Sequence, residues 1–241
     1  MRYVKSLRLQ KHRMEHQQFT VEGTKSVLEL LDSDFEVEFI ICSEDHPEPS
    51  TSVPVHLVST RDMKELSALT TPPGLMAVVK LPNWYLSPSA PSEADVNKGI
   101  LVLDGVRDPG NLGTLIRTAE WFGFKRILAD SDTVDCFNPK VVQASMGSVF
   151  RMEVLYHSLE TFSGIEAPWY GLDLGGSSLF EQTSTRGYFV VGNESHGLRA
   201  AVRERITEYL HIPGGGNAES LNAAMSGAIL LSELFRKGMT A

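Results

Sequence analysis

Three polar, glycine-containing loops each follow an apolar, strand-like segment and lead into a helical pattern. They lie at residues 103–117 (LDGVRDPGNLGTLIR), 190–198 (VVGNESHGL) and 212–222 (IPGGGNAESLN). Strands that alternate with helices predict an α/β fold with a parallel sheet. Because ligands bind at the carboxyl ends of the strands in such sheets, we expect the three loops to form one site.

The same alternation extends over residues 96–241, which we expect to form one unit. Its strands are short apolar runs, and its helices show helical periodicity or start signals such as Asn138-Pro139. We expect strands at 100–104, 126–129, 150–155, 169–174, 188–192 and 208–212, and helices at 111–122, 139–146, 198–204 and 219–236.

Residues 1–95 are expected to form a smaller α/β unit together with a linker. Residues 83–98 are rich in Pro, Ser and acidic residues without periodicity, which is typical of a linker. Thr60 is expected to cap the second of two longer helices. Beyond a basic helix at the start, we expect strands at 19–21, 37–42, 53–58 and 74–80, and helices at 23–31 and 60–69.

The formal net charge of −8 argues against extensive phosphate contacts, because proteins that grip nucleic acids usually carry excess Lys and Arg. The first thirteen residues are the exception, with Arg2, Lys5, Arg8, Lys11 and Arg13 and no acidic residue. A spacing of about three residues places these side chains on one helix face. This segment is either a solvated surface helix or an arm that follows RNA phosphates.

Several classes of protein are excluded or disfavoured. The chain has no apolar run of the ~20 residues that a membrane helix needs, and its basic start lacks the apolar core of a signal peptide. We expect Cys42 and Cys136 to be reduced thiols of a cytoplasmic protein. No metal is expected, since we find no His/Cys/Asp cluster with ligand spacing. P-loop, dinucleotide-binding Gly-x-Gly-x-x-Gly and Gly-x-Ser-x-Gly motifs are also missing.

The three loops together resemble the three motifs of the SpoU (TrmH) family of RNA ribose 2′-O-methyltransferases, which belong to the SPOUT class. The motifs occur in the family's order and cover residues from about 99 to 236. They comprise Asp108-Pro109-Gly110-Asn111-Leu112-Gly113 with Arg117, Gly192-Asn193-Glu194 with Gly197, and Ile212-Pro213 with Ser220-Leu221-Asn222. The chain departs from the pattern at Gly214, where the family often has Met.

The resemblance implies a SPOUT α/β domain with a deep carboxyl-terminal trefoil knot, preceded by a small α/β domain similar to ribosomal protein L30e that binds the RNA substrate. It implies S-adenosylmethionine as cofactor and a homodimer with sites near the interface. The cofactor contacts carried over are Gly192, Asn193, Ile212, Pro213 and Leu221. The catalytic set carried over is Arg117, Asn111, Glu194, Ser220 and Asn222.

Each residue of the catalytic set also has a simpler interpretation. Asn111 would cap the helix that follows it, Glu194 would be a loop carboxylate, and Ser220 with Asn222 would cap the last helix. Arg117 is proposed as a base in the family, but a guanidinium normally stays protonated. A clamp on a phosphate or on the 2′-oxygen is therefore the alternative role.

The interpretation that we favour is an enzyme that methylates the ribose 2′-hydroxyl of RNA, and the separate amino-terminal unit favours rRNA as the substrate. A tRNA 2′-O-methyltransferase differs only in substrate. A non-catalytic RNA-binding module would keep the fold without turnover.

Overall fold

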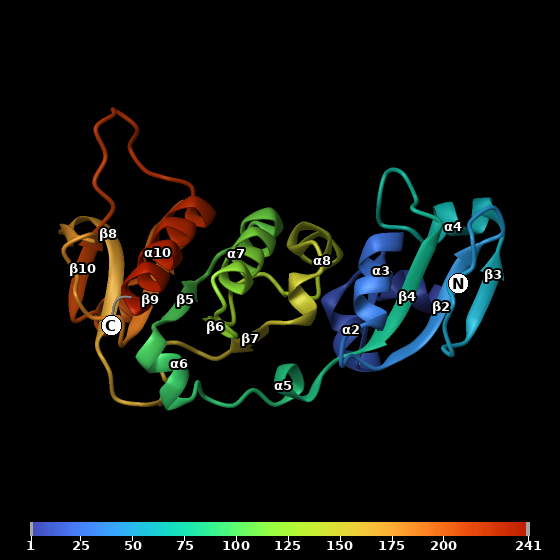
Figure 1. The fold of residues 1–241 in the computed structure, drawn as a ribbon, viewed down its shortest axis with the longest axis horizontal. Coiled ribbons are helices and arrows are strands. Elements are labelled where there is room, and N and C mark those ends of the chain that lie inside the picture. Colours follow the sequence, from blue (N-terminus) through green and yellow to red (C-terminus); the bar gives the residue numbers. More distant parts are fainter. Residues whose placement is uncertain (1, 240–241) are drawn as a thin grey trace.

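The structure is a computed structural model that describes residues 2–239, and it contains two sheets at the two ends of an elongated molecule (Figure 1). The amino-terminal sheet has the order β1-β4-β2-β3, in which β2 and β3 are parallel and the other pairs are antiparallel. Its strands are β1 (Gln18–Glu22), β2 (Val37–Ser43), β3 (Val55–Val58) and β4 (Leu75–Lys80).

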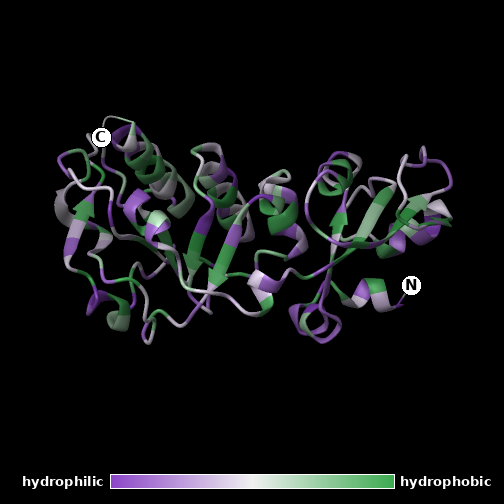
Figure 2. Ribbon diagram, turned by 60° about the horizontal axis from the view of Figure 1, so that its bottom comes forward, coloured by the Kyte–Doolittle hydropathy of each residue, from purple (hydrophilic) through white to green (hydrophobic). Residues whose placement is uncertain are grey.

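The second sheet has the order β10-β8-β9-β5-β6-β7, and every neighbouring pair is parallel. All five residues of β5 are buried, as expected for the centre of a parallel sheet that is covered on both faces. Figure 2 shows apolar colouring on strands of both sheets and on parts of the helices beside them. The strands are β5 (Ile100–Asp104), β6 (Arg126–Ala129), β7 (Glu153–Tyr156), β8 (Trp169–Ser178), β9 (Tyr188–Gly192) and β10 (Glu208–His211).

The helices of this second unit begin where the sequence places caps. Pro109 and Pro139 occupy first turns, which suits proline because its missing N–H needs no partner there. The expected helix at 219–236 begins only at Ala223, because Asn222 is its N-cap, and the expected strand at 150–155 begins at Glu153. The helices are α7 (Pro109–Trp121), α8 (Pro139–Ser145), α9 (Ala200–Arg203) and α10 (Ala223–Gly238), with a 3-10 turn at Ser148–Phe150. The deep knot stays a prediction.

The basic first segment is not the single solvated helix that the spacing predicts. It forms α1 (Arg2–Ser6) and α2 (Gln10–His16), which precede α3 (Thr24–Leu31) and α4 (Thr60–Leu66). Arg8 donates to the backbone oxygens of Leu66 and Ser67 at the end of α4. The cap of α4 is Ser59 and not Thr60, since the Ser59 hydroxyl accepts the N–H of Asp62 at 3.1 Å.

Arg13 is the larger correction, because it is 2% exposed and cannot reach an RNA phosphate. Its Nε donates to Asp135 Oδ2 at 2.9 Å, and its Nη2 forms an ion pair with the same oxygen. Asp135 belongs to the second unit, and its other oxygen accepts the hydroxyl of Tyr85 at 3.0 Å. A buried charge needs a charged partner, and here the partner lies 122 residues along the chain.

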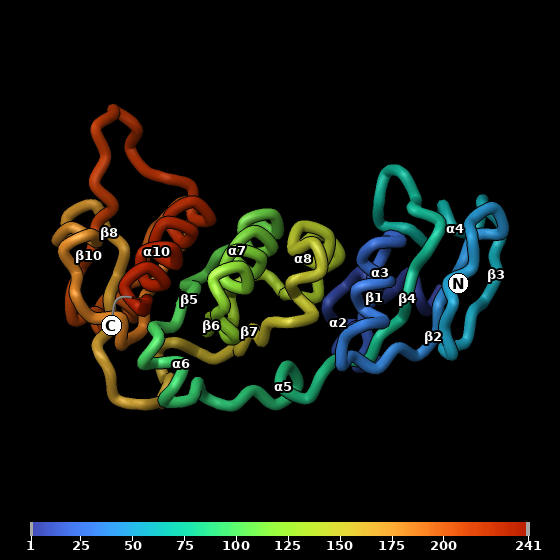
Figure 3. Tube along the Cα trace, viewed as in Figure 1, coloured from blue at the N-terminus to red at the C-terminus, as the bar shows by residue number. Residues whose placement is uncertain are grey.

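The expected linker is largely ordered. It contains α5 (Asn83–Leu86) and α6 (Glu93–Lys98), and α6 begins with a capping box formed by Ser92 and Asp95. Figure 3 shows this segment running along one side of the molecule between the two sheets. One apolar core includes buried residues of both units, among them Phe19 and Phe137, whose rings lie 4.2 Å apart. The domain division at residue 95 stays a prediction. Within residues 2–239, none of the helices combines the length and apolarity needed to cross a membrane.

Candidate active site

The loops that follow β9 and β10 meet at a pocket of about 330 Å³. This volume is within the range of small-molecule and cofactor sites. A larger groove of about 730 Å³ lies between the two units, but none of the expected site residues lines it. The smaller pocket is lined by Leu172, Asp173, Leu174, Val191, Gly192, Asn193, Glu194, Ser195, Gly197, Leu210, His211, Ile212, Ser220, Leu221, Ala223 and Ser226.

Four of the five expected cofactor residues line this pocket, namely Gly192, Asn193, Ile212 and Leu221, and Pro213 does not. Gly192 has a steric reason to be glycine, since a Cβ there would lie 2.4 Å from the carbonyl carbon of Gly197. The chain folds back tightly at this point, because the backbone N–H of each of Asn193 and Gly197 donates a hydrogen bond to the carbonyl oxygen of the other.

The side chain of Asn193 holds its own loop in place. Its Nδ2 donates to the carbonyl oxygen of Gly105 at 2.7 Å, and its Oδ1 accepts the N–H of Ser195 at 2.9 Å. The loop after β9 is thereby tied to the loop after β5. A cofactor in the pocket would meet the backbone of Asn193 more readily than its side chain, because the side-chain polar atoms already have partners.

Three of the expected catalytic residues are joined in one chain of hydrogen bonds. Asn111 Nδ2 donates to Glu194 Oε1 at 2.9 Å, and Asn222 Nδ2 donates to Asn111 Oδ1 at 3.0 Å. Each residue comes from a different one of the three loops, so the expectation that the loops form one site is supported by direct contacts. Asn111 does not cap α7, because the cap is Asp108, whose Oδ1 accepts the N–H of Asn111 at 2.8 Å.

Asn222 is the N-cap of α10, as its sequence position suggested, and it also contacts the first loop. Its Oδ1 accepts the N–H groups of Ala224 and Met225 and so caps α10, while its amide nitrogen reaches Asn111. A single amide side chain can do this because it carries an acceptor at one end and donors at the other.

Glu194 is held in its ionised form. Partial burial raises the pKa of this carboxyl. Hydrogen bonds from the Asn111 amide and from the backbone N–H groups of Glu194, Asp108 and Arg107 together lower the pKa by more than burial raises it, so the net pKa lies below its ordinary value. An ionised carboxylate at the pocket rim places a negative charge next to the space that a ligand would fill.

Arg117 and Ser220, the other two expected catalytic residues, do not take part in these hydrogen bonds. Ser220 lines the pocket from residues 213–222, all of which are exposed, and Figure 3 shows this connection between β10 and α10 extending away from the sheet. Arg117 is exposed on α7 and does not line the pocket, and its side chain makes no hydrogen bond or ion pair with the other described residues. Its expected catalytic role therefore stays a prediction.

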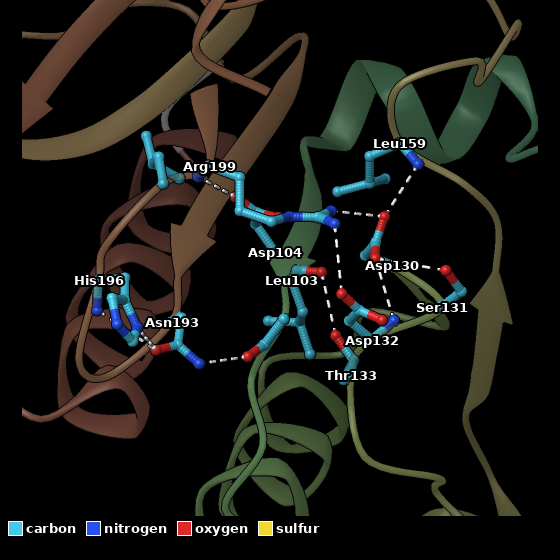
Figure 4. A network of polar contacts seen from close by, with 12 residues as sticks. Leu103, Asp104, Asp130, Ser131, Asp132, Thr133, Leu159, Asn193, His196 and Arg199 are labelled. Atoms are coloured by element: carbon cyan, nitrogen blue, oxygen red, sulfur yellow. Dashed lines mark hydrogen bonds and ion pairs between the residues drawn. The ribbon is translucent and has the colours of Figure 1, made fainter. Parts of the chain in front are cut away.

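A network of charged side chains that the sequence did not predict joins Arg199, which follows the second loop, to Asp104 at the end of β5. Figure 4 shows the guanidinium of Arg199 directed at three aspartates. Its nitrogens lie 2.5 Å from Asp104, 2.7 Å from Asp130 and 3.5 Å from Asp132. Burial lowers the pKa of Arg199, but its bonds to Asp130 and Asp104 raise it more, so the net pKa lies above its ordinary value. Asp104 and Asp130 end two apolar runs, and this was the available sequence signal.

Two further pocket residues lie where the sequence shows no motif: Asp173 in the middle of β8, and His211 as the last residue of β10. His211 Nδ1 lies 2.7 Å from the carbonyl oxygen of Gly176. Asp173 Oδ2 lies 3.1 Å from Arg203 Nη2. Both are polar groups in a pocket whose other walls include the apolar side chains of Val191, Leu210 and Leu221. Apolar walls with a few polar groups fit a flat heterocycle with polar edges, such as the adenine of S-adenosylmethionine.

Comparison with known proteins agrees with this geometry. Residues 98–232 match the SpoU rRNA Methylase family, and residues 1–77 match the MRM3-like substrate binding domain. The 23S rRNA (guanosine(2553)-2′-O)-methyltransferase RlmP of Bacillus subtilis is 31% identical over 95% of this chain and 93% of its own length.

Two solved structures are similar over nearly the whole chain. A TrmH-family protein from Porphyromonas gingivalis has 36% identity and a TM-score of 0.82, covering 98% of this chain and 96% of that one. The AdoMet-bound rRNA methyltransferase of Sinorhizobium meliloti has 26% identity and a TM-score of 0.84, covering 98% and 93%. With the three loops joined at one pocket and both parts of the chain matched, this protein belongs to the SpoU rRNA methylase family.

Proposed function

We propose that this protein transfers a methyl group from S-adenosylmethionine to a ribose 2′-hydroxyl of rRNA. The observation that carries the proposal is the meeting of three loops at the pocket, with Asn111, Glu194 and Asn222 joined across them. The B. subtilis relative, which is matched over 93% of its own length, is named for a 2′-O-methylation of 23S rRNA.

The methyl transfer depends more on the alignment of the reacting groups than on the stabilisation of a new charge. When bound, S-adenosylmethionine supplies an electrophilic methyl group on a positively charged sulfur. The protein must then hold the ribose hydroxyl in line with that methyl group and accept or direct the hydroxyl proton. Gly192, Asn193, Ile212, Pro213 and Leu221 are proposed to hold the cofactor, through backbone groups and apolar side chains.

The hydrogen bonds among Asn111, Glu194 and Asn222 hold the three loops in fixed positions relative to one another. Because Glu194 is ionised and bonded to Asn111, it fixes the first and second loops relative to each other. Asn222 adds the third loop while capping α10. Ser220 is proposed to contact the cofactor or the ribose from the exposed loop that it shares with Leu221.

Arg117 is proposed to act on the RNA within a homodimer. It lies four residues before Trp121 on α7, so the two side chains share a helix face, and Trp121 is 82% exposed. Exposed apolar residues continue onto α10 at Met225 and Phe235. An apolar surface of this kind suits a second copy of the chain, which would bring Arg117 close to the partner's pocket.

The unit at residues 1–95 is proposed to bind the RNA substrate, and residues 96–241 to carry out the transfer. Support comes from the match of residues 1–77 to a substrate binding domain. Of the basic residues at the start, Arg2, Lys5 and Lys11 remain available for phosphates, whereas Arg8 and Arg13 are engaged within the protein. A cytoplasmic location is also proposed, because Cys42 and Cys136 are both buried free thiols.

The test is methyl transfer from labelled S-adenosylmethionine by the purified protein to unmodified 23S rRNA, 16S rRNA and a tRNA pool, followed by mapping of 2′-O-methyl positions. Incorporation into one rRNA position supports the proposal. Incorporation into tRNA alone would favour the alternative substrate. Cofactor and RNA binding without incorporation into any of these RNAs would favour the non-catalytic module.

A further inference from the structure

Three side chains with metal-binding donors gather on α2, away from the candidate active site. His12, Glu15 and His16 lie at positions i, i+3 and i+4 of this helix, and one donor atom from each lies within 4.8 Å of the other two. Residues at this spacing share one helix face. The expectation that the chain has no metal-ligand spacing missed this group, whose sequence signal is the helical spacing of His12, Glu15 and His16.

Existing contacts already orient the donors toward one another. His12 Nδ1 lies 3.0 Å from Glu15 Oε2, and the rings of His12 and His16 are stacked with centroids 6.4 Å apart. The ring of Tyr3 packs edge-on against His16 at 4.9 Å. The contact between His12 and Glu15 holds this carboxylate on the same face of α2 as the two imidazole rings.

The helix that carries the donors is firmly attached to the rest of the molecule. Arg13, between His12 and Glu15, is buried in its ion pair with Asp135 and also donates to the carbonyl oxygens of Leu7 and Arg8 at 2.9 Å. The donors therefore project from a fixed backbone, while their own side chains are exposed or half-buried and free to adjust.

We propose that His12, Glu15 and His16 form a binding site for a zinc ion. Two imidazole nitrogens and one carboxylate oxygen suit Zn²⁺, whereas Ca²⁺ and Mg²⁺ prefer all-oxygen sites. With zinc–ligand distances of ~2.0–2.2 Å in a tetrahedron, the donors must approach to about 3.3 Å of one another. Side-chain rotation can supply the difference from 4.8 Å, and the fourth position stays open to water.

The site is separate from the methyl-transfer pocket, so its metal has no role in the proposed reaction. It lies in the part of the chain that matches the substrate binding domain, and His16 also lines the larger groove between the two units. Loss of the metal should therefore leave S-adenosylmethionine binding unchanged.

The test is calorimetric titration of the full chain, without a polyhistidine tag, with zinc chloride. We expect one zinc ion per chain, with affinity weakened at least ~10-fold in His12→Gln, in His16→Gln and in Glu15→Gln. His56→Gln is the matched control, since His56 is an exposed histidine of the same unit outside the group, and it should bind zinc like the unchanged chain. A hundredfold excess of Mg²⁺ should not compete.

Far-UV circular dichroism checks that each variant keeps its helices. No zinc binding by the unchanged chain would overturn the proposal, and so would undiminished binding by the doubly substituted His12→Gln/His16→Gln protein. Undiminished binding by Glu15→Gln alone would remove the carboxylate from the site and refute the three-ligand arrangement.

Discussion

Replacing Asp135 by Asn should destabilise the protein strongly, because it removes the charge that faces buried Arg13. The two side chains are 2% and 3% exposed, and Arg13 reaches the carboxylate through both Nε and Nη2. Removing one partner of a buried ion pair costs about 3–5 kcal/mol of unfolding free energy, since the other charge stays in a poorly solvating environment. For a chain of 241 residues this corresponds to a drop in Tm of roughly 6–20 °C.

Differential scanning calorimetry measures this change, and urea unfolding gives the free energy. Lys11→Gln is the matched control, because Lys11 is a basic residue on the exposed side of the same helix and its loss should stay within about 0.5 kcal/mol. The double variant Arg13→Gln/Asp135→Asn should be more stable than the sum of the single variants indicates. A loss below about 1 kcal/mol for Asp135→Asn would refute the reasoning, as it would mean that water reaches the pair.

Further predictions concern the site. Arg117→Ala and Arg117→Lys should both abolish methyl transfer, because the point charge of Lys cannot replace the planar, forked guanidinium of Arg. The calorimetric affinity for S-adenosylhomocysteine should stay within about twofold, because Arg117 lies outside the pocket. Near-normal turnover of the Lys variant would contradict this role. Gly192→Ala should weaken that affinity at least ~10-fold, since the added Cβ meets the backbone of Gly197 at 2.4 Å and overpacking costs ~1–3 kcal/mol; unchanged binding would disprove it. The pKa of Glu194 lies below its ordinary value of 4.5, so the stability that its ionised form contributes is complete above that pH and is lost as the pH falls through the lowered pKa. The Tm values of Glu194→Gln and of the unchanged chain, measured between pH 3 and 6, should therefore converge toward the acid end. Parallel curves would contradict a stabilising role of the ionised carboxylate. Trp121→Glu should turn a dimer into a species near 27 kDa in sedimentation equilibrium, and an unchanged mass would remove Trp121 from the interface.

The sequence alone was sufficient for the elements whose signals are local. Strands such as 100–104, 126–129 and 188–192 are continuous apolar runs, and the structure has them within the same bounds. Helix starts carry short-range chemistry, as at Pro139 after Asn138. The meeting of the three loops followed from one topological rule, that the carboxyl ends of parallel strands share an edge of the sheet.

Errors arose where a local pattern had more than one physical solution. Residues 83–98 lack periodicity, yet Ser92 and Asp95 form a capping box, and Trp84 packs against Phe137 with ring centroids 5.7 Å apart. A helix of one or two turns has too few residues to show a period, so only its caps and its tertiary contacts reveal it.

Long-range pairing could not be derived from the sequence at all. Arg8 and Arg13 belong to the same series of basic residues as Lys5 and Lys11, yet they are engaged within the protein because the carbonyl groups at the end of α4 and Asp135 lie beside them. Asn111 looked like a helix cap until the fold placed Glu194 and Asn222 within 3.0 Å of its amide. The sequence determines the charge and shape of each side chain. Whether that side chain contacts water, a partner or a ligand depends on which distant segments the tertiary structure brings beside it, because desolvation and hydrogen bonding depend on the groups within a few ångströms.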